Sequence, residues 1–175
     1  MAVAAGFLAG CKGTGATVSV TTDSASMQTE KNRVTALNAV QSFGDQKPDA
    51  IFVNCATDFI DYGSGEDKPM KNIDSIKAGM KQYFAAFPDL KLTNLTSFAH
   101  GDSALVYCTM SGTFKSDFMG MKANGKSFKF DDVDVFTFSK DGKITTHRSV
   151  QQSATSMAQL GIKMPPPPPA PPAKK

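Results

Sequence analysis

Apolar residues recur every three positions between residues 34 and 43, which predicts a helix with one apolar face. The residues of this face are Val34, Leu37, Val40 and Phe43. Gly44 follows and is expected to end the helix. A second, short helix is expected over residues 47–55, because Pro48 suits the first turn of a helix. Residues 58–62 then alternate as a short strand.

A longer helix is predicted next, with apolar residues on one face and signals at both ends. The residues of this face are Ile73, Ile76, Met80, Tyr83, Phe84 and Phe87. Asn72 is a good N-cap, and Asp74 lies in the first turn, where the positive end of the helix dipole favours a carboxylate. Pro88 is expected to end the helix.

Beyond Pro88 the hydrophobic period changes to two, which predicts strands. The expected strands cover residues 91–99, 103–114, 127–138 and 144–152. The sequence Lys140-Asp141-Gly142-Lys143 predicts a hairpin turn between the last two. Helices followed by antiparallel strands are typical of an α+β fold.

Several short segments, taken in order and with their spacing, resemble one family. They are Phe87-Pro88-Asp89-Leu90, Ser111-Gly112-Thr113, Phe118-Met119-Gly120-Met121, Asn124-Gly125-Lys126, Val133-Asp134-Val135-Phe136, Asp141-Gly142-Lys143-Ile144 and Gln159-Leu160-Gly161. Together they resemble the SnoaL-like polyketide cyclases, or ester cyclases, of the nuclear transport factor two-like superfamily over residues 30–162. The resemblance implies a curved antiparallel sheet wrapped around N-terminal helices, shaped as a cone with an internal pocket. It also implies homodimers paired through the sheet.

The chain departs from this family where the resemblance places the catalytic acid. Family members carry a Trp on the last strand and, four residues later, an Asp that serves as acid–base catalyst. Aligning on the segment ending at Ile144 puts Arg148 at the Trp position and Gln152 at the Asp position. A glutamine amide cannot exchange a proton with carbon and oxygen during an aldol cyclisation. We therefore expect Gln152 to contact a ligand and not to act as the acid.

A second constellation is expected on the last two strands. Phe136, Asp134 and Asp132 share a face of their strand that should look into the cone. If the hairpin register is even, Arg148 lies opposite or diagonal to Asp134, and the two form a charge-assisted pair. Asp134 then serves as a base or polar anchor with Arg148 orienting an anionic or carbonyl substrate. The alternative is a structural ion pair in which each buried charge compensates the other.

Further pocket residues follow from the same placement. Phe84, Phe118 and Phe136 are expected to contact the ligand from the long helix, a flexible loop and the sheet. Tyr62 stands where relatives often have His, and it either donates a hydrogen bond to a carbonyl or forms part of the wall. His147 is expected on the face opposite Arg148, toward solvent or a dimer contact, with no catalytic role.

Composition narrows the classes of function. The 175 residues carry a formal net charge of +3, and no segment combines Lys and Arg with interleaved aromatics, so nucleic-acid binding is not expected. The three cysteines form no CxxC pair, and the two histidines have no metal-ligand spacing. We expect no metal and no cofactor, with Cys55 and Cys108 as small buried hydrophobic residues.

Both ends differ in composition from the domain between them. An apolar leader ends in Leu8-Ala9-Gly10-Cys11, which resembles a bacterial lipobox, although no Lys or Arg precedes it. Residues 1–29 are interpreted as a signal remnant and flexible tether, with lipidation at Cys11 and a location in the cell envelope; the alternative is an apolar leader of no consequence. Residues 163–175 are rich in proline and are expected to be disordered, or to serve as a spacer or a ligand for a proline-binding groove.

Two functions remain open from the sequence. The first is a lipid-anchored domain that binds a small apolar or carbonyl-containing molecule, or a partner protein, without catalysis. The second is a cofactor-independent lyase, isomerase or hydrolase that uses Asp134 with Arg148. An Asp134 side chain free of Arg148 and facing a cavity favours the enzyme, whereas a locked ion pair in a filled cone favours binding.

Overall fold

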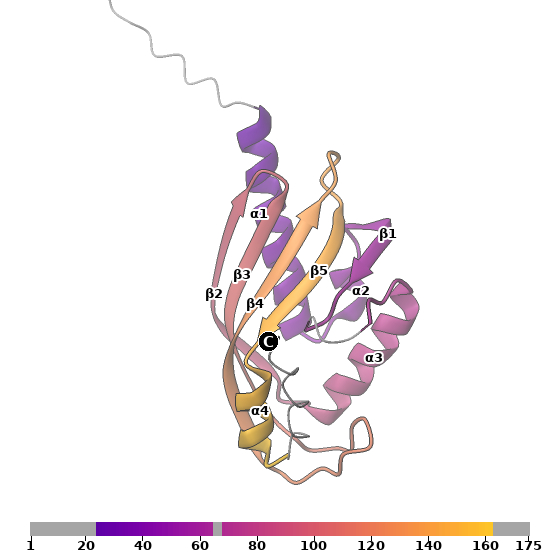
Figure 1. The fold of residues 1–175 in the computed structure, drawn as a ribbon, viewed down its shortest axis with the longest axis vertical. Coiled ribbons are helices and arrows are strands. Elements are labelled where there is room, and N and C mark those ends of the chain that lie inside the picture. The colour runs from indigo at the N-terminus through magenta and orange to yellow at the C-terminus, as the bar shows by residue number, and fades with distance from the viewer. Residues whose placement is uncertain (1–23, 65–67, 163–175) are drawn as a thin grey trace, which may run out of the picture.

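The computed structural model describes residues 24–64 and 68–162. The helices are α1 (Ser24–Gly44), α2 (Pro48–Ile51), α3 (Ile73–Ala86) and α4 (Ser153–Leu160), and the strands are β1 (Cys55–Asp61), β2 (Lys91–His100), β3 (Ser103–Thr113), β4 (Ser127–Phe138) and β5 (Ile144–Gln151). Cys11 and the proline-rich segment lie outside the described residues. Figure 1 shows a curved sheet with α1, α2 and α3 against one side and α4 at its lower end. None of the helices in residues 24–64 and 68–162 is long and apolar enough to cross a membrane.

The sheet has the strand order β1-β5-β4-β3-β2. Strands β2, β3, β4 and β5 pair antiparallel with one another, as the alternating pattern predicts. The pairing of β1 with β5 is parallel, so the sheet is mixed and not wholly antiparallel. A parallel neighbour needs a long crossover, and here the whole stretch from α3 to β4 separates the two strands. The α+β class is confirmed: helices come first, and a meander of strands follows.

Helix α1 packs against β2 and β3. Its buried face runs through Asn32, Ala36, Ala39 and Val40, whereas Val34 is 40% exposed. The helix also begins at Ser24, inside the segment expected to be a tether. Good helix formers continue upstream of the apolar face, and Gln28 Nε2 donates to Asn32 Oδ1 at 2.9 Å, one turn along the same helix.

Helix α2, strand β1 and helix α4 also differ from the sequence prediction, whereas α3 begins as predicted. Helix α2 ends at Ile51, and β1 already begins at Cys55, because the edge of β5 offers hydrogen bonds to this segment. Helix α3 begins after Asn72 as predicted, with the Asn72 side chain accepting a hydrogen bond from the backbone NH of Ser75 at 2.8 Å. Helix α4 was not predicted from the pattern, since its eight residues give only two turns of periodicity.

Buried apolar residues form two groups under the sheet. One lies among α1, β1 and the middle strands, and includes Cys108, which is fully buried, with the half-buried Cys55 packed against it. The other lies between the end of α3 and the start of β4 and is filled by aromatic rings, among them Phe87, Phe114 and Phe128. The cavity in this structure is lined mainly by residues of the first group and reaches Phe43 and Met110 of the second.

Candidate functional site

A cavity of about 240 Å³ lies between the helices and the sheet. Its apolar lining consists of Ala39, Val40, Phe43, Ile51, Phe52, Cys55, Phe59, Met80, Met110, Phe136 and Ile144. Its polar lining consists of Asp61, Gly63, Ser64, Asp132, Asp134, His147, Ser149 and Gln151. An apolar wall with polar groups gathered on a few strands is the usual construction of a small-molecule site, and the volume suits a ligand of one or two rings.

Strand β4 supplies two of the carboxylates. Its residues alternate between the two faces of the sheet, so Asp132, Asp134 and Phe136 all point to the cavity. This is the placement that the sequence predicts for Asp134 and Phe136. Asp132 lies two residues before Asp134 on the same face and is 1% exposed.

Strand β5 contains a β-bulge that changes which of its residues face the cavity. Phe138 pairs with Ile144, but Thr137 pairs with Thr146, so Thr145 is an extra residue on β5. The hydroxyl of Thr137 lies 2.8 Å from that of Thr145 and 2.6 Å from that of Thr146, which holds the bulge in place. Beyond the bulge the odd-numbered residues His147, Ser149 and Gln151 face the cavity.

The even register predicted for this hairpin is therefore wrong. Asp134 pairs with Ser149, and Arg148 pairs with Val135 on the opposite face of the sheet. Arg148 is exposed, and its guanidinium carbon lies 5.0 Å from the centre of the Tyr62 ring. The predicted pair of Asp134 with Arg148 does not form. The prediction assumed that every second residue after Ile144 faces the same side of the sheet as Ile144 does. The extra residue Thr145 reverses the side that each later residue of β5 faces.

His147 stands in the place expected for Arg148, which corrects its assignment to solvent or a dimer contact. Its Nδ1 lies 3.0 Å from Asp61 Oδ1 and its Nε2 lies 2.9 Å from Asp134 Oδ1. Desolvation lowers the pKa of His147, but the hydrogen bonds and charges of Asp134 and Asp61 outweigh it and raise the pKa to about 10. The ring is therefore an imidazolium at neutral pH and donates from both nitrogens.

Asp61 reaches the cavity from the end of β1. It pairs with His147 across the parallel ladder, and its Oδ1 also accepts a hydrogen bond from the Gly63 backbone NH at 2.9 Å. Burial raises the pKa of Asp61, but the hydrogen bond and charge of His147 and the Gly63 NH more than offset this, so the pKa lies below its ordinary value. Asp61 is accordingly an anion that holds one side of the imidazolium.

Asp132 is the cavity group with a pKa nearest to neutral. Burial and the neighbouring negative charge of Asp134 raise its pKa to about 6, although hydrogen bonds to the carboxylate act in the opposite direction. Ser149 Oγ donates to Oδ1 at 2.7 Å, and Gln151 Nε2 donates to Oδ2 at 3.3 Å. A buried carboxyl that gains and loses its proton near pH 6 beside an apolar cavity has the properties of a general acid or base.

The other ligand contacts expected from the sequence do not line this cavity. Phe84 is buried in the second apolar group, and Phe118 packs there against the Tyr83 ring at 5.6 Å between centres. Tyr62 follows the last residue of β1 and lies under Arg148 on the outer side of the sheet. Gln152 is the exposed N-cap residue of α4, one position beyond the strand, so Gln151 takes the place in the cavity that was expected for it.

Sequence reasoning missed five polar residues of the site: Asp61, Asp132, His147, Ser149 and Gln151. The period of two places Asp132 on the inward face with Asp134, but it does not show that this carboxyl has a role. Asp61 and the three β5 residues could not be found from the sequence, because a distant parallel pairing and a bulge place them. Among residues 24–64 and 68–162, no cluster of His, Cys, Asp and Glu is arranged to hold a metal ion.

The fold and the cavity define a class of protein: a curved sheet folded over helices, with acidic and imidazole groups at the end of an apolar pocket. The chain matches the SnoaL-like polyketide cyclase family over residues 33–160 and belongs to it. No curated protein sequence matches the chain.

Several solved structures share the fold of this chain. AclR from Streptomyces galilaeus, a proposed hydroxylase, is 26% identical with a TM-score of 0.66, and the match covers 78% of this chain and 99% of that one. A proposed polyketide cyclase from Xanthomonas campestris pv. campestris is 15% identical with a TM-score of 0.69, covering 76% of this chain and 98% of that one. IdmH from Streptomyces antibioticus, also a proposed polyketide cyclase, is 22% identical with a TM-score of 0.61, covering 75% and 99%.

Proposed function

We propose that the chain is a cofactor-independent enzyme that binds a small, largely apolar carbonyl compound and moves a proton on it with Asp132. The observation that carries the proposal is the buried Asp132 carboxyl with its pKa near 6, facing an apolar cavity of about 240 Å³. A base of this kind can remove a proton from the carbon beside a carbonyl and return it elsewhere, as isomerisation and cyclisation both require. Asp132 thereby replaces Asp134 as the base expected from the sequence.

The other polar groups have supporting roles in this proposal. Ser149 and Gln151 orient the Asp132 carboxylate through their hydrogen bonds. Both nitrogens of His147 are already engaged with carboxylates, so the ring holds Asp61 and Asp134 together and does not carry the proton. The negative charge of Asp134 beside Asp132 contributes to the raised pKa of Asp132.

The proposal can be tested without the natural substrate by measuring hydrogen–deuterium exchange at the activated carbons of 2-tetralone in D2O by NMR. We expect the protein to accelerate this exchange at least about 100-fold more than an Asp132→Asn variant does, the lower end of the usual contribution of general acid–base catalysis. Asp131→Asn is the matched control. Asp131 directly precedes Asp132 on β4, but it does not line the cavity, and its carboxylate accepts a hydrogen bond from Thr109. Equal exchange by wild type and Asp132→Asn would refute the proposal.

Binding without catalysis is the second candidate, and the amide side chains at the end of β5 favour it. The position that the family resemblance assigns to an acid holds Gln152, and the neighbouring cavity residue is Gln151, another amide. In that case 2-tetralone binds in the cavity, as shown by shifts of the NMR signals of its lining residues, while the exchange rate stays at the level of Asp132→Asn.

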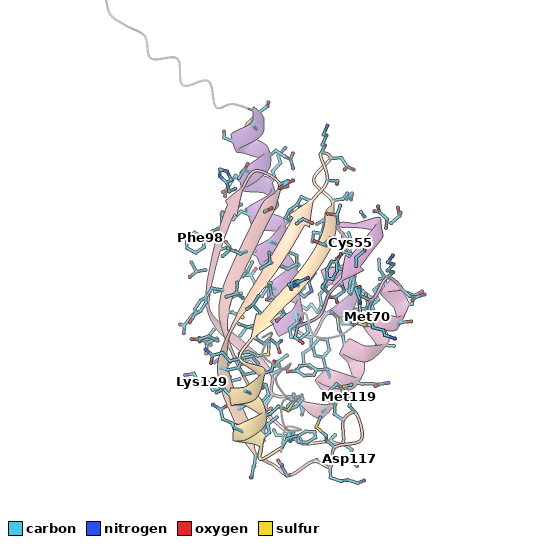
Figure 2. The ribbon with its side chains drawn as sticks, viewed as in Figure 1. Cys55, Met70, Phe98, Asp117, Met119 and Lys129 are labelled. Carbon is cyan, nitrogen blue, oxygen red and sulfur yellow. The ribbon has the colours of Figure 1, made fainter. Side chains whose placement is uncertain are left out.

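We further propose that the domain is exported and lipid-anchored through Cys11, and that it pairs with a second copy through the outer face of the sheet. The first point is supported by the Leu8-Ala9-Gly10-Cys11 sequence. The second is supported by apolar residues on that face. Phe98 and Val150 are 58% and 56% exposed, and Leu105, which pairs with Phe98, is 38% exposed. Figure 2 shows Phe98 at the β2 edge of the sheet, away from the body of the protein.

A further inference from the structure

The polar end of the cavity carries more negative than positive charge. Three carboxylates, Asp61, Asp132 and Asp134, line it with one imidazolium, His147. The cavity therefore has an excess of two negative charges when Asp132 is ionised and of one when it is protonated. Within residues 24–64 and 68–162, no lysine or arginine lines the cavity, and Arg148 lies on the other face of the sheet.

The excess has two parts. The single positive charge of His147 contacts both Asp61 and Asp134 and offsets one of these two carboxylates, so one negative charge remains there, and Asp132 adds the second when it is ionised. The donors that meet the Asp132 side chain, Ser149 and Gln151, are neutral, although Asp132 is 1% exposed. A buried carboxylate without a positively charged partner is costly, and a cation bound beside it would remove much of that cost.

The absence of a free cation in the described lining also affects the chemistry proposed above. Removing a proton from the carbon beside a carbonyl leaves negative charge on the carbonyl oxygen, which enzymes usually stabilise with a cation or with directed hydrogen-bond donors. Both N–H groups of His147 are directed at carboxylates, so this imidazolium cannot donate to the oxygen without breaking one of those bonds. A positive charge on the substrate itself would meet this need.

We propose that the compound bound in this cavity is a small apolar carbonyl compound that also carries a protonated amine. The ammonium group compensates the excess negative charge beside Asp132 and Asp134, and it stabilises the charge that develops on the carbonyl oxygen. The rings of Phe43, Phe52, Phe59 and Phe136 line the remaining wall and can face a cation favourably. This inference depends on the proposed function, because it assumes that the cavity is the binding site.

Three probes with one bicyclic skeleton test the inference: 2-aminotetralin as the cation, 2-tetralone as the neutral ketone and tetralin-2-carboxylate as the anion. Their affinities are measured at pH 7 from the NMR shifts of the cavity residues. We expect 2-aminotetralin to bind at least about tenfold more tightly than 2-tetralone, about 1.4 kcal/mol, and the carboxylate to show no saturable binding. The Asp132→Asn variant should lose most of the preference for the amine, and Asp131→Asn should keep it.

The outcomes separate this inference from the proposed function. If 2-tetralone or the carboxylate binds as tightly as the amine, the inference is wrong while the cavity remains the binding site. If the amine is preferred equally by wild type and Asp132→Asn, the preference does not come from Asp132 and the inference is again wrong. If none of the three probes shifts the cavity residues of the wild-type protein, both the inference and the proposed function fail.

Discussion

His147 Nε2 lies 2.9 Å from Asp134 Oδ1, although the sequence places Arg148, and not His147, on the face of β5 that looks at Asp134. This contact joins β4 and β5 inside the cavity, and the second contact of His147 joins them to β1 through Asp61. The imidazolium thus connects three neighbouring strands at the polar end of the site.

Removing His147 should destabilise the fold strongly. The His147→Ala variant leaves Asp61 and Asp134, both largely buried, without their shared cation, which costs roughly 3–5 kcal/mol. Arg148→Ala is the matched control, since it removes a cation from the next position but from an exposed contact with Tyr62 worth about 0.5–1 kcal/mol. Urea denaturation measures both. An Arg148→Ala variant that loses as much stability as His147→Ala would contradict the register described here.

The stability of the protein should fall as the pH rises above neutral. The pKa of His147 is about 10 in the folded state against 6.5 as its ordinary value, so its contribution is complete below about pH 6.5 and is lost as the pH rises toward 10. The interval from pH 7 to pH 8.5 lies below the ordinary pKa of 9.0 for a thiol, so cysteine ionisation contributes little there. In this interval the unfolding free energy should decrease by up to about 1.4 kcal/mol per pH unit. A His147→Gln variant should show a flat profile in this interval. Equal slopes for both proteins would show that His147 is not held as a cation.

Ser149 should control the pH at which Asp132 becomes a base. The hydroxyl of Ser149 donates to the ionised carboxylate and so lowers the pKa of Asp132, opposing the effect of burial. In Ser149→Ala this hydrogen bond is lost and the pKa of Asp132 rises above 6. The pH profile of 2-tetralone exchange should therefore rise with pH through about 6 in the wild type and at higher pH in the variant. A lower or unchanged midpoint would show that Asp132 is not the group that titrates.

The outer face of the sheet should hold two copies of the chain together. Leu105→Glu places a charge in the middle of the apolar row formed by Phe98, Leu105 and Val135, and should convert a dimer to a monomer in light scattering. Met119→Glu is the control, because Met119 is 81% exposed on a hairpin away from this face, near the lower end of α3 in Figure 2. A wild-type protein that is monomeric at high concentration would contradict the prediction.

Lipidation should depend on Cys11. Full-length protein made in a bacterium should incorporate labelled fatty acid and sediment with membranes, and Cys11→Ser should do neither, because the thiol is the acceptor. Cys55→Ser is the control, since this cysteine is half-buried in the domain. Equal labelling of the Cys11→Ser protein would refute lipidation at this position.

The sequence alone determined the class of fold and the part of the site that β4 supplies. The three- to four-residue period before Pro88 and the two-residue period after it are local properties of the chain, and they correctly placed α3, the four long strands and the inward face of β4 with Asp134 and Phe136. Such periods persist because each element must bury one face, whatever it packs against.

The tertiary structure decided which groups meet Asp134. The extra residue Thr145 reverses the face of β5, and nothing in local hydrophobicity marks it, because Thr145 and Thr146 are both half-buried polar residues that suit either face. Asp61 enters the site because β1 pairs in parallel with β5. Asp61 and His147 are 86 residues apart in the sequence. The burial that raises the pKa of Asp132 exists only when helices, β4 and β5 enclose it together. A period along the chain assigns a residue to a face, but the register between strands determines its neighbours, and that register is fixed only by the assembled sheet.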